Sequence, residues 1–271
     1  MLYENFNWAS APLNSFNFAL LMSCSYLGAC LLHRTIFLND PPEFSIWKYF
    51  KSFVPLHNLV LSLGSLLMFI GCLREVVVRS YKEGSAEWLL CESPATTSNG
   101  PLWFWSYLYY LSKYYELLDT LLQILRGRYP PHYFLHAYHH GAVILMSWVW
   151  INYSASMQFI GILFNTAVHV VMYYYFYLKS HNIEPKWKKL VTLFQIVQFI
   201  TSVVCFVATM YLVHGLKKDC KGIRILYGSI FFNITLLFGF IKVLFTSKPR
   251  HISVSDVKDS IKVSKERLKN K

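Results

Sequence analysis

Seven apolar stretches separated by short polar segments constrain this chain more than any other feature of its sequence. A transmembrane helix needs about 20 consecutive apolar residues, within a range of roughly 17 to 25. The stretches cover residues 16–34, 53–73, 101–125, 135–152, 156–178, 189–213 and 223–246. We therefore predict an all-α polytopic membrane protein with seven transmembrane helices. Its membrane domain spans residues 1–246, and a flexible basic tail follows at 247–271.

The composition excludes several other classes of protein. Of 271 residues, 55% are hydrophobic, 18% are aromatic and only 15% are charged. Soluble domains usually carry about 25% charged residues, so an ordinary cytosolic enzyme and a disordered chain are both excluded. A net charge of +12 could suit a nucleic acid. The basic residues, however, lie in the gaps between apolar stretches and in the tail, which indicates a lipid bilayer and no nucleic-acid partner.

The distribution of lysine and arginine predicts the orientation. One side of the membrane receives 17 of them, including eight in the tail, and the other side receives 7. Cytosolic loops carry the excess of positive charge. The C-terminus is therefore expected in the cytosol and the N-terminus across the membrane.

The cysteines suggest one covalent link. Cys91 and Cys220 fall in two different non-cytosolic loops, and the other four cysteines fall inside apolar stretches. An oxidising lumen permits a disulfide, whereas thiols buried in a span act as small hydrophobes. We predict a Cys91–Cys220 disulfide.

The third stretch contains ionisable residues where lipid should disfavour them. Each charged group in a span costs about 2.5–3.5 kcal/mol on insertion scales, so such groups are candidates for function. Lys113, Glu116 and Thr120 lie within about 60° on a helix, and Asp119 lies one step further round. Lys113 and Glu116 can pair at i,i+3. The group is either a structural ion pair between helices or the wall of a polar cavity.

Three histidines open the fourth stretch. His136, His139 and His140 cover about 100° of helix surface, so all three can face one cavity. A lone histidine is most often a packing residue, but three beside a helix with Lys, Glu and Asp are not explained that way.

Polar side chains also mark the fifth and sixth stretches. Asparagine and glutamine can simply hold helices together, so each stretch alone is weak evidence. Polar stripes on four successive helices nevertheless indicate a shared polar interior. The residues are Asn165, His169, Tyr173 and Tyr175 in the fifth stretch, and Gln195 and Gln198 in the sixth.

Three kinds of activity fit such an interior. The string His-x-x-His-His also occurs in membrane di-iron desaturases and hydroxylases, and Glu116 or Asp119 could complete a 2-His-1-carboxylate site. Neutral imidazole is also a good nucleophile and base, and it can carry an acyl group taken from a thioester. The third alternative is a seven-helix lipid transporter or receptor without chemistry, although the chain lacks an internal repeat.

Together these strings resemble the ELO family of very-long-chain fatty acid elongases, the membrane 3-ketoacyl-CoA synthases. The resemblance covers nearly the whole chain and looks most like the fungal and amoebal branch acting on saturated and monounsaturated chains. Phe176 departs from a tyrosine often found in the family. The strings are Pro55 with His57-Asn58, Lys113-x-x-Glu116-x-x-Asp119-Thr120, His136-x-x-His139-His140, Asn165-x-x-x-His169-x-x-Met172-Tyr173-x-Tyr175, Thr192-x-x-Gln195-x-x-Gln198-Phe199 and Leu237-Phe238.

The resemblance implies an endoplasmic reticulum protein in which helices 2–7 form a barrel around an acyl-chain tunnel. The implied reaction condenses a long-chain acyl-CoA with malonyl-CoA. No cofactor or metal is expected, because the NADPH steps belong to partner enzymes: a ketoacyl-CoA reductase, a dehydratase and an enoyl-CoA reductase.

Roles for the site residues follow as hypotheses. The catalytic residues are His136, His139, His140, His169 and Asn165. The substrate-binding residues are Lys113, Glu116, Asp119, Tyr173, Tyr175, Gln195 and Gln198, with Lys186, Lys188 and Lys189 meeting the CoA phosphates.

Overall fold

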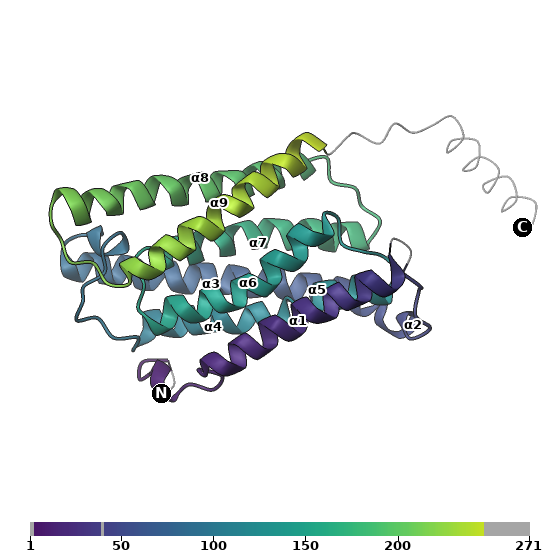
Figure 1. The fold of residues 1–271 in the computed structure, drawn as a ribbon, viewed down its shortest axis with the longest axis horizontal. Coiled ribbons are helices and arrows are strands. Elements are labelled where there is room, and N and C mark those ends of the chain that lie inside the picture. The colour runs from purple at the N-terminus through teal and green to yellow at the C-terminus, as the bar shows by residue number, and fades with distance from the viewer. Residues whose placement is uncertain (1–2, 39–40, 247–271) are drawn as a thin grey trace, which may run out of the picture.

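A computed structural model describes residues 3–38 and 41–246, and within these ranges all regular secondary structure is helical apart from two isolated bridges. The predicted tail at 247–271 lies outside the described residues. Figure 1 shows the long helices running beside one another. They are α1 (Phe16–Phe37), α3 (Phe53–Glu83), α4 (Pro101–Tyr115), α5 (Leu118–Leu125), α6 (Tyr133–Asn152), α7 (Gln158–Ser180), α8 (Lys188–Met210) and α9 (Ile223–Thr246). The short ones are η1 (Trp8–Ser10), α2 (Trp47–Phe50), η2 (Glu87–Leu89) and the π-helical η3 (Tyr211–Gly215).

Five of these helices are long and apolar enough to cross a membrane. They are α1, α3, α7, α8 with η3, and α9. The all-helical, polytopic membrane architecture is therefore confirmed. The stretch 101–125 is divided between α4 and α5, and α6 begins with the histidines. Because the α4–α5 pair and α6 do not meet that standard, seven crossings remain a prediction.

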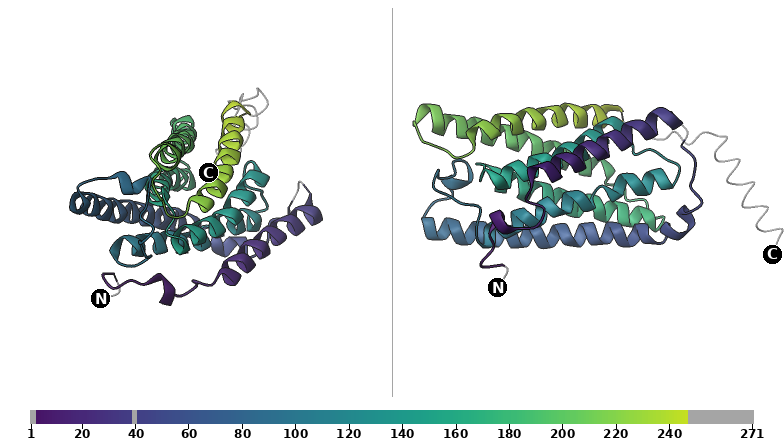
Figure 2. Two further views of the ribbon diagram at one scale, coloured as in Figure 1. Left: turned by 60° about the vertical axis from the view of Figure 1, so that its left-hand side comes forward. Right: turned by 60° about the horizontal axis from the view of Figure 1, so that its bottom comes forward.

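Six helices close into a ring. The neighbouring pairs are α3–α4, α4–α6, α6–α9, α9–α8, α8–α7 and α7–α3, and α1 packs on α6 from outside the ring. Figure 2 shows α1 (purple) at the edge of the bundle. Large apolar side chains such as Leu31, Val204 and Phe231 are exposed on the outer faces. In a bilayer these faces meet lipid rather than water.

Helix α3 is longer than the apolar pattern indicates. It ends at Glu83 instead of residue 73, and Gly84 caps it in the left-handed region at φ +67°. Glycine adopts this conformation without a steric penalty, which makes it a common helix terminator. In the added turns Arg79 pairs with Glu83 and Glu92, each at 2.7 Å.

The predicted single helix over 101–125 is wrong at one point, because α4 ends at Tyr115 and α5 begins at Leu118. Between them the backbone tightens into three-residue hydrogen bonds. The amide of Leu117 donates to the carbonyl of Tyr114 at 3.2 Å, and that of Asp119 to Glu116 at 3.1 Å. A tightened turn inside a helix often marks a functional position. Here it separates Glu116 from Asp119.

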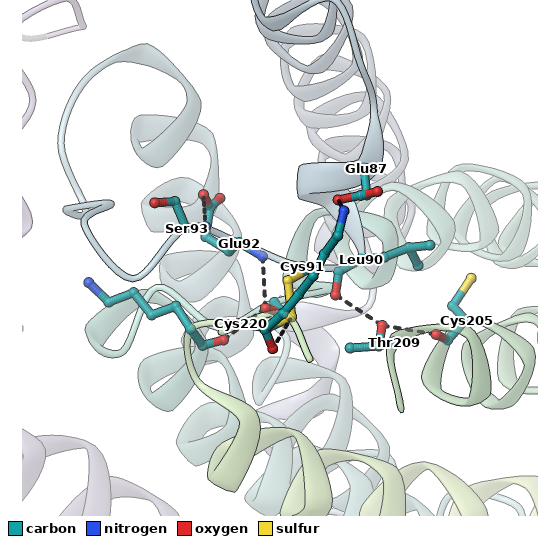
Figure 3. The surroundings of a disulfide bond; sticks show 11 residues. Glu87, Leu90, Cys91, Glu92, Ser93, Cys205, Thr209 and Cys220 are labelled. Atoms are coloured by element: carbon teal, nitrogen blue, oxygen red, sulfur yellow. Dashed lines mark hydrogen bonds and ion pairs between the residues drawn. A yellow bond between two sulfur atoms is a disulfide. The ribbon is translucent and has the colours of Figure 1, made fainter. Parts of the chain in front are cut away.

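A disulfide joins Cys91 to Cys220, the pair expected from the sequence, with 4.8 Å between their Cα atoms. Figure 3 shows the disulfide between the loops that follow η2 and η3. A third loop joins them, because the amide of Ser156 donates to the carbonyl of Lys221 at 3.1 Å. The amide of Glu92 donates to Ser156 Oγ at 3.0 Å. The loops after η2, α6 and η3 thus form one connected cap.

Removing the disulfide is expected to destabilise the protein. Cys91→Ser or Cys220→Ser should lower the free energy of unfolding by about 2–4 kcal/mol, because the bond links residues 129 apart in sequence. Thermal unfolding in detergent measures the change, and mobility on non-reducing gels reports the bond. Cys205→Ser removes a free cysteine and is the control. The prediction is contradicted if Cys91→Ser unfolds at the same temperature as Cys205→Ser.

Candidate functional site

A buried ion pair at the C-terminal end of α4 forms one wall of the polar interior. The Lys113 and Glu116 side chains are each 1% exposed, and Lys113 Nζ lies 2.7 Å from Glu116 Oε1. Lys113 also donates to Asn165 Oδ1 at 3.0 Å, and His169 Nδ1 lies 3.4 Å from Glu116 Oε1. Buried charges persist only when they are paired and hydrogen-bonded. The i,i+3 pair predicted from the sequence therefore connects α4 to α7.

The amide of Asn165 is fixed by two donors. Lys113 Nζ and the Tyr109 hydroxyl both donate to its oxygen, Tyr109 at 3.1 Å. The Lys113 ammonium has no lone pair, so it could not accept a hydrogen bond from the amide nitrogen, and this fixes which end of the amide faces it. Nδ2 makes no hydrogen bond to the described residues. Tyr109, which is 2% exposed, is not among the residues predicted from the sequence. The sequence feature that could have identified it is its spacing, because it lies one helical turn before Lys113 and so shares a helix face with it.

A second polar cluster surrounds Asp119. One carboxylate oxygen accepts from Tyr173 OH at 2.6 Å, and the other lies 2.8 Å from His57 Nε2. His57 comes from α3 and is 1% exposed. Both oxygens of Asp119 are thus occupied by side chains from α3 and α7. In this structure Asp119 and Tyr173, expected to bind substrate, bind each other.

The three histidines of α6 form one contiguous group. The ring centroids of His136 and His140 are 4.3 Å apart, and those of His139 and His140 are 5.4 Å apart. Thr120 Oγ1 lies 2.8 Å from His136 Nε2. Within the described ranges, the buried Nδ1 atoms of His139 and His140 have no hydrogen-bond partner. Buried polar atoms are normally paired, so these two are candidates for contact with a ligand.

An elongated cavity begins at this group. Its walls come from α4, α6, α7, α8 and α9, and most of them are apolar. His139 and Asn165 line one part of it, while Ser156 and Met157 belong to the loop cap held by the disulfide. Along α6 the lining runs from His139 to Trp150, which is about 16 Å at 1.5 Å per residue. The shape suits an extended apolar chain with its reactive end at the histidines.

The predicted site residues divide into two groups. Three of them, His139, Asn165 and Gln198, line the cavity. The others described above belong to the buried clusters linked to Asn165, Asp119 and the histidines of α6. Tyr175 instead packs on Trp187, with 5.4 Å between ring centroids, and Gln195 donates to Met172 Sδ at 3.5 Å. The three lysines predicted to bind CoA phosphates are exposed near the start of α8; they are Lys186, Lys188 and Lys189.

The grouping of possible metal ligands can be examined in the described residues. In the described parts of the chain, no three or more His, Cys, Asp and Glu side chains are grouped to hold a metal ion. His136 and Asp119 are already bonded to Thr120, Tyr173 and His57.

Comparison with known proteins places the chain in a family. The model described as the ELO: GNS1/SUR4 family matches residues 11–250. The chain belongs to the ELO family. The match includes α1 and every helix of the ring, so the histidine group and the cavity both lie within the family domain.

Curated relatives of this ELO protein come from several organisms. Fatty acid elongase A of Dictyostelium discoideum is 34% identical over 199 residues, which cover 73% of this chain and 69% of the relative. Fatty acid elongase sre1 of the same organism is 35% identical over 204 residues, covering 73% of this chain and 72% of the relative.

A further Dictyostelium discoideum protein, whose name assigns it provisionally to the fatty acid elongases, is 35% identical over 195 residues. That match covers 72% of this chain but 63% of the relative, slightly less than two thirds of its length. No solved structure matches this ELO protein.

Proposed function

We propose that this ELO family protein is the condensing enzyme of fatty acid elongation. It joins a saturated or monounsaturated long-chain acyl-CoA to malonyl-CoA and yields a 3-oxoacyl-CoA, CO₂ and CoA. One observation carries the proposal: His139 and Asn165 line the same elongated, mostly apolar cavity. The names of the relatives, fatty acid elongases, support it.

The proposal includes a membrane topology. The protein crosses the endoplasmic reticulum membrane seven times, with a lumenal N-terminus and a cytosolic C-terminus. Two facts support this: the excess of basic residues on one side of the apolar stretches, and a disulfide between two loops assigned to the opposite, oxidising side. The histidine group then lies near the cytosolic mouth, because α6 begins at Tyr133 on that side.

In the first chemical step His139 attacks the thioester carbon of the acyl-CoA. A C–N bond forms and the C–S bond breaks, so that CoA leaves as a thiolate and takes the imidazole proton. His139 is favoured over His136 because it lines the cavity, whereas His136 is bonded to Thr120. Imidazole serves both as nucleophile and as a good leaving group for the next step.

In the second step malonyl-CoA loses CO₂, and its new carbanion attacks the acyl carbon. A C–C bond forms and the C–N bond to His139 breaks. The imidazolate that leaves takes up one proton from water, which restores the neutral ring and supplies the proton that the overall reaction consumes. Asn165 Nδ2 is free to donate to the developing oxyanion, since its Oδ1 is held by Lys113 and Tyr109. Loss of one such donor typically lowers the rate by about 10²- to 10³-fold. His169 is oriented by Glu116 at 3.4 Å.

The CoA group remains at the cytosolic mouth. Lys186, Lys188 and Lys189 are exposed where the chain enters α8, and ammonium groups bind phosphate by charge-assisted hydrogen bonds. The 3-oxoacyl-CoA product must be reduced, dehydrated and reduced again to become a longer acyl-CoA. We therefore expect a ketoacyl-CoA reductase, a dehydratase and an enoyl-CoA reductase as functional partners.

Purified protein incubated with palmitoyl-CoA and malonyl-CoA tests the function. We expect CO₂ release that requires both substrates, survives a chelator and accompanies formation of a 3-oxoacyl-CoA. A chelator-sensitive reaction would favour a di-iron desaturase or hydroxylase, and no reaction would favour a transporter or receptor. Palmitoyl-CoA alone should release one CoA per active site. Release of CoA only when both substrates are present would contradict the covalent scheme.

A further inference from the structure

The first transmembrane helix carries a polar stripe that faces the histidine helix. Its members recur at spacings of three and four residues along α1, so they share one face. The hydroxyl of Ser23 donates to the carbonyl of Gly141 at 2.8 Å, and that of Tyr133 donates to the carbonyl of Cys30 at 2.7 Å. The stripe consists of Ser23, Tyr26, Cys30 and His33.

Tyr26 is the member of this stripe that connects to a histidine of the site. Its hydroxyl lies 2.8 Å from Thr120 Oγ1 on α5, and Thr120 Oγ1 lies 2.8 Å from His136 Nε2. Thr120 is 2% exposed, so water does not compete for its hydroxyl. The His136 ring in turn lies 4.3 Å from His140. Hydrogen bonds thereby connect α1, which lies outside the ring of six helices, to the histidines of α6.

The direction of these hydrogen bonds follows from the two hydroxyls. A phenol is the stronger donor and the weaker acceptor, because its lone pair is delocalised into the ring, whereas an aliphatic hydroxyl accepts and donates equally well. Tyr26 therefore donates to Thr120. The hydrogen of Thr120 is then directed to His136 Nε2, which must be unprotonated to accept it. The proton of the neutral ring consequently lies on Nδ1.

We propose that Tyr26 is a positioning residue of the condensing enzyme: through Thr120 it holds His136 in the Nδ1-protonated tautomer. The inference rests on the proposed function and deepens it. His136 is then a hydrogen-bond donor in the site and not a base. The base that passes the proton of His139 on to the CoA thiolate is then His140, whose Nδ1 is buried and without a partner in the described structure. Helix α1 is accordingly part of the active site and not only a membrane anchor.

Two single variants and their combination test the proposal. Tyr26→Phe removes the donor and keeps the ring, and Thr120→Val breaks the link at its centre. Each should lower kcat by about 10- to 100-fold with little change in KM, by analogy with the loss of a residue that orients a metal-bound histidine. The double variant should be no worse than Thr120→Val alone, because both changes break one chain. Thr120→Ser keeps the hydroxyl and should retain kcat.

Ser23→Ala is the matched control, because it deletes a different hydrogen bond between α1 and α6 on the same helix face. It should leave kcat unchanged, and unfolding temperatures identify any variant that does not fold. Wild-type kcat in Tyr26→Phe would overturn the inference, and so would an equal loss in Ser23→Ala. Both outcomes assume an active wild-type enzyme. A wild-type protein without condensation would instead overturn the proposed function.

Discussion

His139→Ala is expected to lower the condensation rate by about a thousandfold or more. General acid–base groups contribute about 10²- to 10⁴-fold, and removal of a covalent nucleophile costs at least as much. The alanine variant should also lose the release of CoA from palmitoyl-CoA alone. Folding should be preserved, because His139 makes no side-chain hydrogen bond within the described structure and stacks loosely on Phe232, with 6.3 Å between ring centroids.

His214→Ala is the control for this variant. His214 is exposed on η3, where its Nε2 lies 3.5 Å from the Tyr227 hydroxyl, and this substitution should leave the rate unchanged. The two purified proteins should be assayed for CO₂ release at saturating substrates. A His139→Ala enzyme that keeps more than a tenth of the wild-type rate would exclude His139 as the nucleophile.

The length of the apolar stretches predicted most of the helices, because lipid requires a long apolar segment in each span. The last stretch, 223–246, coincides with α9, and the start of α3 at Phe53 agrees with the prediction. The predicted and observed helix ends differ where polar residues continue a helix beyond its apolar stretch. In α3 the extra turns are stabilised by the pairing of Arg79 with Glu92, a residue of a separate loop. Hydropathy along the sequence carries no information about such a partner.

The candidate site was predictable wherever a charge or an imidazole stood out in a span. Lys113, Glu116, His139 and His169 belong to this group because polar residues in an apolar helix are rare and need partners. Helical spacing also correctly predicted that Lys113 and Glu116 form an ion pair. What could be predicted was the set of groups and their shared face, and not which atoms they bond across helices.

Two tyrosines were not predicted as site residues, and the reason is physical. Tyr26 and Tyr109 resemble their apolar neighbours in a chain with 19 tyrosines, and only tertiary packing shows which hydroxyl reaches a polar partner. His57 was part of the resemblance but received no role, because its partner Asp119 lies 62 residues away. Tyr175 shares a motif with His169 and packs on Trp187, so its role in binding substrate stays a prediction.

Lys113→Met is expected to destabilise the protein by about 3–5 kcal/mol. The substitution keeps the length of the side chain and removes the charge that neutralises Glu116, which is 1% exposed. Breaking one partner of a buried pair leaves an uncompensated charge, and this costs far more than the pair contributes. Activity should be lost as well, because Asn165 would lose a donor that fixes its amide. Thermal unfolding in detergent measures the loss of stability.

A second substitution distinguishes the effect of the unpaired Glu116 charge on stability from the effect of the altered side-chain packing. Lys113→Met combined with Glu116→Gln removes both charges, so stability should recover in large part, since a buried pair contributes little net stability over neutral groups of similar size. The double variant should nevertheless remain inactive, because neither the donor to Asn165 nor the carboxylate beside His169 returns. Lys218→Met breaks an exposed pair with Glu87 and should change stability by less than about 1 kcal/mol. If Lys113→Met is no less stable than Lys218→Met, the charged pair does not hold the interior together, and its role is confined to orienting Asn165 and His169 for the reaction.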